Sequence, residues 1–271
     1  MKKLYGSVAL VIGASSGVGK ACAEFLHKYG YKVYGTSRKV EFPDSEIMED
    51  GIVMVPLEVT DSNSIKKVVD YIIGREGEIN LLINCPGYGL SGAVEDISLN
   101  EVREIFETNL FGIMMVCRNV LPYMRENKKG LIVNISSVAG IISIPYQSMY
   151  SATKYALEAV SEAMRIEVKP FGVKVALIEP GDMKTNFIRI AAKDADENSV
   201  YKLRYEKAVD EMIKSEENGP EAEVVIKELK RILKKRNPSL RNIVGMKYKL
   251  IGKLRKLLPE RLLELIISNV Y

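Results

Sequence analysis

Tryptophan is absent from the 271-residue sequence, histidine occurs once, as His27, and there are only three cysteines. Cys22, Cys85 and Cys117 are widely spaced and form no C-x-x-C motif, so the sequence lacks the ligand spacing of a zinc site. A single histidine also argues strongly against a Ser-His-Asp or Cys-His nucleophile. An odd, sparse set of cysteines is typical of a reducing compartment. We therefore expect no metal centre and a cytoplasmic protein.

Long hydrophobic runs are absent as well. No apolar run approaches the roughly 20 residues that are needed to cross a bilayer. Lys2 and Lys3 precede an apolar run at residues 8–12, but that run ends in glycines and not in a cleavage site, so it does not match a signal peptide. With 47% hydrophobic residues and no low-complexity tract, residues 1–271 are expected to form one large α/β domain with a buried core.

Negative charge is scarce near the C-terminal end. Residues 227–261 hold thirteen Lys and Arg but only Glu228 and Glu260, a net charge of +11 within a chain of +4 overall. Apolar side chains recur there at three- and four-residue intervals: Leu250, Leu254, Leu257, Leu258, Leu262, Leu265 and Ile266. We therefore predict a basic amphipathic extension at residues 246–271, with Pro259 dividing two short helices. Its apolar stripe either packs on the body or closes over a pocket, or it lies on an anionic membrane. Both interpretations stay open.

The continuous apolar run at residues 8–12 predicts a strand that is buried on both faces, as in a parallel sheet. Five further strand patterns lie at residues 31–37, 52–57, 79–84, 131–135 and 173–178, with a short seventh strand at 242–245. Helical patterns lie between them. This alternation predicts an α/β fold with a doubly wound parallel sheet and a helical C-terminal extension. Ligands of such sheets bind beyond the carboxyl ends of the strands.

A glycine-rich turn follows the first strand. Gly13, Gly17 and Gly19 have a G-x-x-x-G-x-G spacing, which differs from the G-x-G-x-x-G of the commonest dinucleotide fingerprint. Such a turn presents backbone N–H groups at the start of a helix, where a phosphate is stabilised. We interpret this segment, including Ser15, Ser16 and Val18, as a pyrophosphate site. A plain strand-to-helix turn is the alternative.

The end of the second strand has no carboxylate. An acidic residue at this point would bind the ribose 2′-hydroxyl of NAD. Instead, Thr36 is followed by Ser37, Arg38 and Lys39, and a guanidinium suits the 2′-phosphate of NADP. The sequence therefore favours NADP(H), with a solvated cationic loop as the alternative.

Tyr150 and Lys154 are four residues apart in a predicted helix that runs to about Lys169. Side chains at this spacing share one face, with Cβ atoms about 5–6 Å apart. A nearby cation favours the phenolate and lowers the pKa of a tyrosine, which can then exchange protons near neutral pH. The spacing alone is weak evidence, since most such pairs are solvated helix faces. In the helical pattern at 98–127, Asn109 and Gly112 are poor helix formers, which indicates either a local role or surface filler.

Together these motifs resemble the classical short-chain dehydrogenase/reductase family over about residues 5–185. The glycine turn matches the family's T-G-x-x-x-G-x-G motif, with Ile12 in place of threonine. Asn84 and Gly87 match the ends of N-N-A-G, whereas Cys85 and Pro86 depart from it, and Pro86 lacks a backbone donor. Glu58 and Val59 match the family's adenine-binding Asp-Val pair. The catalytic tetrad is matched by Asn109, Ser137, Tyr150 and Lys154. The P-G-x-x-x-T segment is matched by Pro180, Gly181, Met183 and Thr185.

The resemblance implies a Rossmann fold and an oxidoreductase that transfers a hydride between NADP(H) and a carbonyl or alcohol substrate. Tyr150 would exchange a proton with the substrate oxygen, and Ser137 would hydrogen-bond that oxygen. Lys154 would lower the tyrosine pKa and bind the nicotinamide ribose, while Asn109 would hold a water that leads to solvent. Asn84 and Gly87 would join the cofactor contacts. No metal is needed.

The resemblance also implies a homodimer or homotetramer in which helices 98–127 and 150–169 pack against their symmetry mates. Residues 182–216 would form a loop and helix over the substrate. The C-terminal end is similar to the branch of the family that acts on steroids, retinol and other apolar carbonyls. A noncatalytic NADP-binding sensor or scaffold is the alternative, although such a protein has no need for the whole tetrad. We expect no nucleic-acid partner, because the sequence has no recognised binding module and its pI of 8.7 is moderate.

Overall fold

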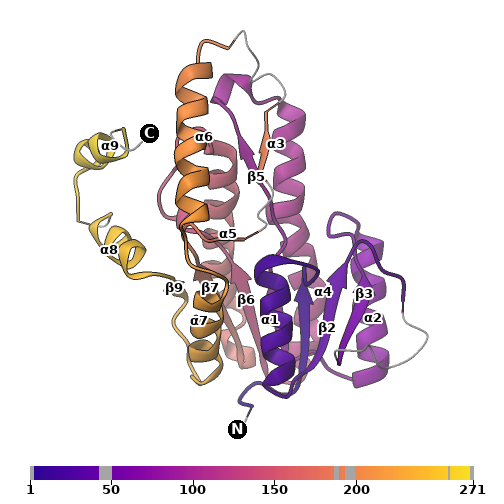
Figure 1. Cartoon of the computed structure of the whole chain (residues 1–271). Coiled ribbons are helices and arrows are strands. Elements are labelled where there is room, and N and C mark those ends of the chain that lie inside the picture. The colour runs from indigo at the N-terminus through magenta and orange to yellow at the C-terminus, as the bar shows by residue number, and fades with distance from the viewer. Residues whose placement is uncertain (1–2, 43–50, 186–188, 193–198, 256, 269–271) are drawn as a thin grey trace.

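Seven parallel strands form the central sheet of the computed structural model, which describes residues 3–42, 51–185, 189–192, 199–255 and 257–268 (Figure 1). Their order across the sheet is β3-β2-β1-β4-β6-β7-β9. The strands are β1 (Val8–Ile12), β2 (Lys32–Ser37), β3 (Ile52–Pro56), β4 (Leu81–Asn84), β6 (Gly130–Ile135), β7 (Val173–Glu179) and β9 (Arg241–Ile243). The doubly wound sheet is confirmed, including the short seventh strand.

Helices cover both faces of this sheet, because alternate strand residues point to opposite sides. In β1, Val8, Leu10 and Ile12 pack towards one helical layer, and Ala9 and Val11 pack towards the other. The first layer contains α2 (Ser62–Glu76), α4 (Gly112–Glu126) and α5 (Ser148–Glu167). The second contains α1 (Gly17–Lys28) and α7 (Glu223–Leu233), which lie side by side in Figure 1. The central strands β1, β4 and β6 are buried along their whole length, whereas the edge strand β3 alternates between buried and partly buried residues.

The helical pattern at residues 98–127 is three consecutive elements. Ser98 and Glu101 form a reciprocal capping box at the start of α3 (Leu99–Phe106). A π-helical turn, Glu107–Phe111, follows, and α4 begins at Gly112. Asn109 lies in the π turn, a feature that is frequent at functional sites. The low helix propensity of this segment therefore coincides with a local change of helical geometry.

Two short strands beyond the main sheet were not predicted. β5 (Gly89–Ser91) pairs in parallel with β8 (Arg189–Ala191), and α6 (Lys202–Glu217) follows β8. The predicted loop and helix at 182–216 is thus partly a strand, and its residues 186–188 and 193–198 lie outside the described residues. This pairing attaches the segment after β7 to the segment after β4.

The C-terminal extension forms two short helices, α8 (Met246–Leu254) and α9 (Glu260–Ser268), on either side of Pro259. In Figure 1, α8 lies next to the sheet edge, where it contacts β9, and α9 lies farther from the sheet. Many side chains of the apolar stripe are exposed, among them Leu257 at 79% and Leu265 at 57%. Across the described residues, no helix is both long and apolar enough to cross a membrane.

Candidate active site

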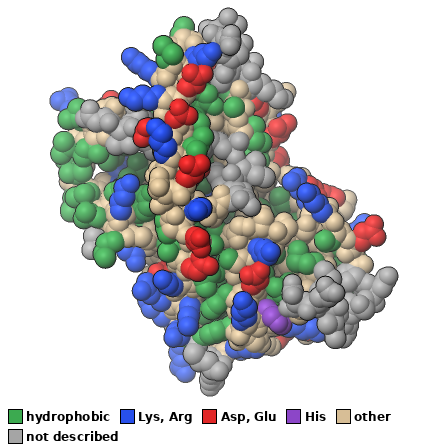
Figure 2. All heavy atoms as spheres, viewed as in Figure 1, with side chains coloured by type: hydrophobic (Ala, Val, Ile, Leu, Met, Phe, Trp, Pro, Cys, Tyr) green, Lys and Arg blue, Asp and Glu red, His purple; other side chains and the backbone are tan. Residues whose placement is uncertain are grey.

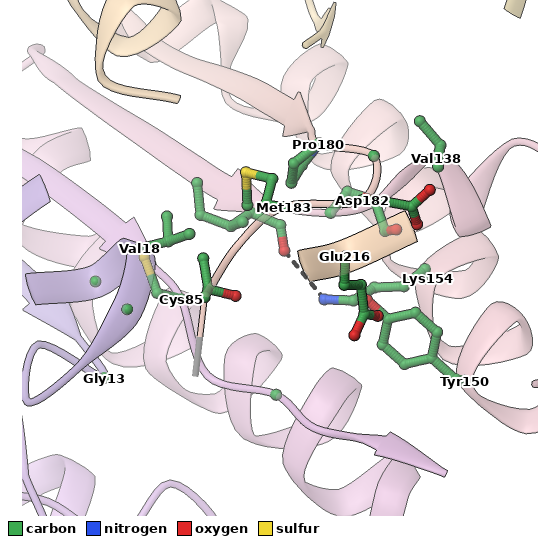
Figure 3. A pocket seen from close by; sticks show the side chains of 18 of the residues that line it. Gly13, Val18, Cys85, Val138, Tyr150, Lys154, Pro180, Asp182, Met183 and Glu216 are labelled. Atoms are coloured by element: carbon green, nitrogen blue, oxygen red, sulfur yellow. Dashed lines mark hydrogen bonds between the residues drawn. The ribbon is translucent and has the colours of Figure 1, made fainter. Parts of the chain in front are cut away.

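A cavity of about 210 Å³ opens at the carboxyl edge of the sheet (Figure 3). The glycine turn, the loop after β4, the start of α5 and the loop after β7 all contribute to its wall. It brings together most of the predicted site residues: Gly13, Ser16, Gly17, Val18, Gly19, Gly87, Ser137, Tyr150, Lys154, Pro180, Gly181, Met183 and Thr185. Side chains that are up to about 170 positions apart in the sequence therefore share one cavity, at the edge where a doubly wound sheet binds ligands.

The glycine turn is shaped for close approach of a ligand to the backbone. Gly13 has φ +77°, and its N–H donates to Thr36 Oγ1 over 3.0 Å. A Cβ at Gly19 would collide with the carbonyl oxygen of Gly13, whereas the space beside Gly17 is open. No side chain caps the start of α1, and its first turn holds no acidic residue. This cradle fits a phosphate group, which would be stabilised at the positive end of the helix.

Tyr150 and Lys154 lie together on the first turns of α5 and are 8% and 4% exposed. The Lys154 ammonium is 5.7 Å from the centre of the Tyr150 ring and donates to the Ile135 carbonyl oxygen over 3.1 Å, the bond drawn dashed in Figure 3. Burial lowers the pKa of Lys154 to about 8, and the nearby Cys85 and Glu158 act in the opposite direction. The buried cation therefore lies beside the phenol, as the four-residue spacing predicted.

Asn109 lies close to this tyrosine–lysine pair, next to the loop after β4. Its side chain accepts from the Tyr88 N–H over 3.1 Å and donates to the Tyr88 carbonyl oxygen over 2.9 Å. A Cβ at Gly87 would lie 3.1 Å from Asn109 Oδ1 and 3.7 Å from Lys154 Nζ. Asn109 therefore has a local role, in which its side chain turns to backbone. Gly87 also has φ +151°, which side chains rarely adopt, so glycine suits this position beside the amide and the ammonium.

Ser137 lines the cavity at the end of β6. Its Oγ accepts from the Ala139 N–H over 3.1 Å, which caps the short 3₁₀ turn Val138–Gly140. A serine hydroxyl has one proton to donate in addition to its lone pairs. Ser137 can therefore cap the turn and donate to a ligand oxygen at the same time.

Several predicted residues do not line this cavity: Ser15, Ser37, Arg38, Glu58, Val59, Asn84 and Asn109. The side chain of Arg38 is 74% exposed and lies 3.9 Å from Glu58 Oε2, at the ends of the neighbouring strands β2 and β3. Asn84 is fully buried, and its amide donates to Asn134 Oδ1 over 2.8 Å. The Asn84 side chain therefore joins the interior of the sheet, and only its backbone could reach a ligand.

Sequence reasoning missed other residues of the wall, notably Gln147, Asp182 and Glu216. Asp182 occupies a variable position of the P-G-x-x-x-T segment, and Glu216 comes from the far end of α6. Thr36 holds the glycine turn through its side chain and carbonyl oxygen, whereas the sequence placed it only at the end of the second strand and gave it no role. No local pattern distinguishes these residues, because each acts through a contact with a distant segment.

The chain is similar to known proteins of one family. The family model described as short chain dehydrogenase matches residues 7–196. The chain is 38% identical to 3-ketodihydrosphingosine reductase of Bacteroides thetaiotaomicron over 267 residues, which is 97% of each chain. It is 32% identical to the NADPH-dependent 3-dehydrocapnine reductase of Ornithobacterium rhinotracheale over 94% of each. The crystal structure of a short-chain dehydrogenase from Streptomyces avermitilis is similar with a TM-score of 0.81 and 35% identity, over 93% of this chain and 94% of that one.

Proposed function

Because the chain belongs to the short-chain dehydrogenase family, whose members are oxidoreductases of carbonyl or alcohol substrates, we propose that it is an NADPH-dependent ketone reductase. The observation that carries the proposal is the meeting of Tyr150, Lys154 and Ser137 in one cavity with the glycine turn. Tyr150 and Lys154 can supply a proton beside the glycine turn, which fits a phosphate group. A nicotinamide cofactor, when bound, supplies the hydride for the substrate carbon.

The side chains of the cavity would act as follows during reduction. Tyr150 donates its proton to the substrate oxygen, and Ser137 donates a hydrogen bond to the same oxygen. Lys154 stabilises the phenolate that remains on Tyr150, and its bond to the Ile135 carbonyl holds the ammonium in place. Asn109, through Tyr88, keeps the loop after β4 close to this centre. Tyr150 and Ser137 thus act on the substrate oxygen directly, whereas Lys154 and Asn109 position the groups that do so.

The cofactor would lie along the carboxyl edge of the sheet. The pyrophosphate would bind at Gly13–Gly19, including Ser15, Ser16 and Val18. The adenosine end would meet Ser37, Arg38, Glu58 and Val59, and the nicotinamide end would meet Gly87, Lys154 and the segment Pro180–Thr185. Asn84 would contribute through its backbone only. The order of these segments follows the order of strands β3, β2, β1, β4, β6 and β7, which supports this assignment.

We expect a preference for NADPH over NADH of about tenfold in affinity, the lower end of what a charge-assisted hydrogen bond contributes, because the Arg38 side chain is largely exposed. Arg38→Ala should weaken NADPH binding and leave NADH binding unchanged, which makes NADH the internal control. Ser37→Asp should reverse the preference, since a carboxylate there repels the 2′-phosphate. Fluorescence titration with both cofactors measures these affinities. Equal affinities in the native chain would refute the NADPH assignment.

For the substrate, we propose a ketone on a long apolar chain. The cavity wall includes Val138, Ile144 and Met183, which are apolar. The two relatives named above are called reductases of 3-ketodihydrosphingosine and 3-dehydrocapnine. Loss of NADPH absorbance with 3-ketodihydrosphingosine tests the proposal, and short water-soluble ketones serve as the comparison. If NADPH is consumed neither with the long-chain ketone nor with the short ketones, the noncatalytic sensor becomes the better interpretation.

We also propose that the chain forms a homodimer through α4 and α5. A groove of about 580 Å³ lies between these helices on the outer side of the sheet. Exposed apolar side chains lie on or beside them, including Met114 at 40%, Ile166 at 69% and Phe171 at 42%. A second copy presenting the same face would cover these side chains, as in a two-fold interface. Light scattering that gave the mass of one 30.3 kDa chain at micromolar concentration would contradict it.

Finally, we propose that the C-terminal extension contacts an anionic membrane. In α9, Leu262, Leu265 and Ile266 are 43–57% exposed, and Figure 2 shows hydrophobic side chains gathered over α8 and α9. Residues 246–271 hold six Lys and Arg against Glu260 and Glu264, and an anionic surface attracts such cations at about 1 kcal/mol for each one near the surface. Such a contact would let the enzyme take its substrate from lipid. The cytoplasmic location expected from the cysteines stays a prediction.

Co-sedimentation with vesicles tests this contact. Bound protein should increase with the anionic lipid fraction and decrease with salt, because both the cations and the exposed leucines contribute. Changing Leu262, Leu265 and Ile266 together to serine should abolish binding without changing the charge. Absence of binding at low salt, or equal binding of this variant, would contradict the proposal.

A further inference from the structure

The carboxylate of Asp182 joins three segments that are distant in the sequence. Asp182 lies in the loop after β7 and lines the cavity. Its Oδ2 accepts from the Ser215 hydroxyl of α6 and from the Tyr248 hydroxyl of α8, each over 2.6 Å. The Tyr248 oxygen in turn accepts from the Asp182 N–H over 3.2 Å. The first helix of the C-terminal extension is therefore tied directly to the cavity wall.

Packing reinforces these hydrogen bonds. The Tyr248 ring lies so close to Gly181 that a Cβ there would collide with it. On the other side, a Cβ at Gly219 would come within 2.8 Å of the Asp182 carbonyl oxygen, and the Lys184 N–H donates to the Pro220 carbonyl over 3.0 Å. The loop after β7 is thus held between the C-terminal end of α6 and the Tyr248 ring.

The position of Tyr248 depends on the last strand of the sheet. The Val244 N–H donates to the Glu179 carbonyl oxygen, which extends the pairing of β9 with β7. Gly245 then turns the chain with φ +88°, a conformation that favours glycine. The next residues start α8, so Tyr248 points back to the loop that begins where β7 ends. The turn at Gly245 therefore directs α8 from the edge strand β9 towards the cavity wall, where Tyr248 contacts Asp182.

We propose that Tyr248 is a positioning residue for the nicotinamide end of the cofactor site, acting through Gly181 and Asp182. The proposal rests on the proposed function, because it assumes that Pro180–Thr185 contacts the cofactor. Most of this loop has no helical or strand hydrogen bonds of its own, so the tyrosine restricts its conformation. A preformed loop binds a cofactor more tightly because less conformational entropy is lost on binding.

Tyr248→Phe in the full-length chain tests the role, because phenylalanine keeps the ring on Gly181 and removes only the hydroxyl. We expect NADPH affinity, followed by fluorescence titration, to fall about tenfold, which corresponds to about 1.4 kcal/mol. The KM for NADPH should rise in parallel, whereas kcat at saturating NADPH should change little. Backbone amides of the 180–185 loop should also exchange with deuterium faster in the variant without cofactor.

Leu250→Ser provides the matched control, since Leu250 is on the same helix and is 58% exposed. It should leave both the affinity and the exchange unchanged. Ser215→Ala removes the other hydroxyl from the same carboxylate and should reproduce part of the effect, which keeps the proposal testable if Tyr248→Phe fails to fold. Unchanged NADPH affinity and loop exchange in a folded Tyr248→Phe protein would overturn it.

The experiment separates this proposal from the proposed function. A native chain that binds NADH better than NADPH would contradict the NADPH assignment, and Tyr248→Phe would then be expected to weaken NADH instead. Slow turnover of every ketone tested would contradict the reductase assignment without altering the binding and exchange measurements. Truncation before Met246 is unsuitable as a test of the membrane contact alone, because it also removes Tyr248.

Discussion

Replacing Tyr150 with phenylalanine should lower kcat for ketone reduction by a factor of about 10²–10⁴, the usual contribution of a positioned acid or base. The substitution removes the proton donor and little volume, so NADPH should still bind. The rate is measured from the absorbance of NADPH with 3-ketodihydrosphingosine, and the affinity is measured separately by fluorescence titration. A large loss of rate at unchanged affinity would assign proton transfer to this side chain.

Tyr155→Phe is the control for this prediction. Tyr155 lies on the same helix, its hydroxyl donates to the Ile141 carbonyl oxygen, and it does not line the cavity. Loss of the Tyr155 hydroxyl removes no group that could give a proton to the substrate, so most of the activity should remain. If Tyr150→Phe kept most of the native rate, the acid–base assignment would be wrong, and the noncatalytic sensor would account better for a preserved cofactor cradle.

Lys154→Met should abolish most of the activity and also make the folded protein more stable near neutral pH. Activity falls because the ammonium beside the Tyr150 ring is lost, and with it the stabilisation of the phenolate. NADPH affinity should fall as well, since Lys154 lines the cavity. Enzyme assays and cofactor titration at several pH values measure both effects. Native-like kcat in this variant would contradict the role of the lysine.

The gain in stability follows from the pKa of Lys154. Burial lowers this pKa from 10.5 in the unfolded chain to about 8, so the folded state disfavours the charged amine. Below pH 8 the native chain bears this penalty in full, by an amount of a few kcal/mol. Between pH 8 and 10.5 the unfolded chain binds more protons than the folded chain, so the stability of the native protein rises with pH.

Thermal unfolding across this range measures the effect. The melting temperature of Lys154→Met should exceed that of the native chain by several degrees at pH 7, and the difference should shrink as the pH approaches 10.5. Lys66→Met is a suitable control, because Lys66 is exposed and distant from the cavity. A lower melting temperature for Lys154→Met at pH 7 would show that the lysine's hydrogen bond to Ile135 stabilises the fold more than its burial destabilises it.

Local patterns in the sequence determined the sheet, the glycine turn and the Tyr150–Lys154 pair. Strands buried on both faces produce continuous apolar runs, a phosphate cradle needs glycines at a fixed spacing, and two residues four apart on a helix must share a face. These features are set by neighbours in the chain, so they are visible without coordinates. Pro259 and the basic leucine-rich end likewise predicted two short helices, which the structure contains.

Only the tertiary structure decided how deeply these groups are buried and what they contact. The pKa of Lys154 near 8 depends on layers packed around it, the side chain of Asn84 turns inward to Asn134, and β5 pairs with a strand 100 residues away. The hydrogen bond between Tyr248 and Asp182 spans 66 positions. Such contacts impose no periodicity on the sequence, because either partner alone is an ordinary polar residue; they exist only once β9 has added to the sheet and the turn at Gly245 has directed α8 back to the cavity.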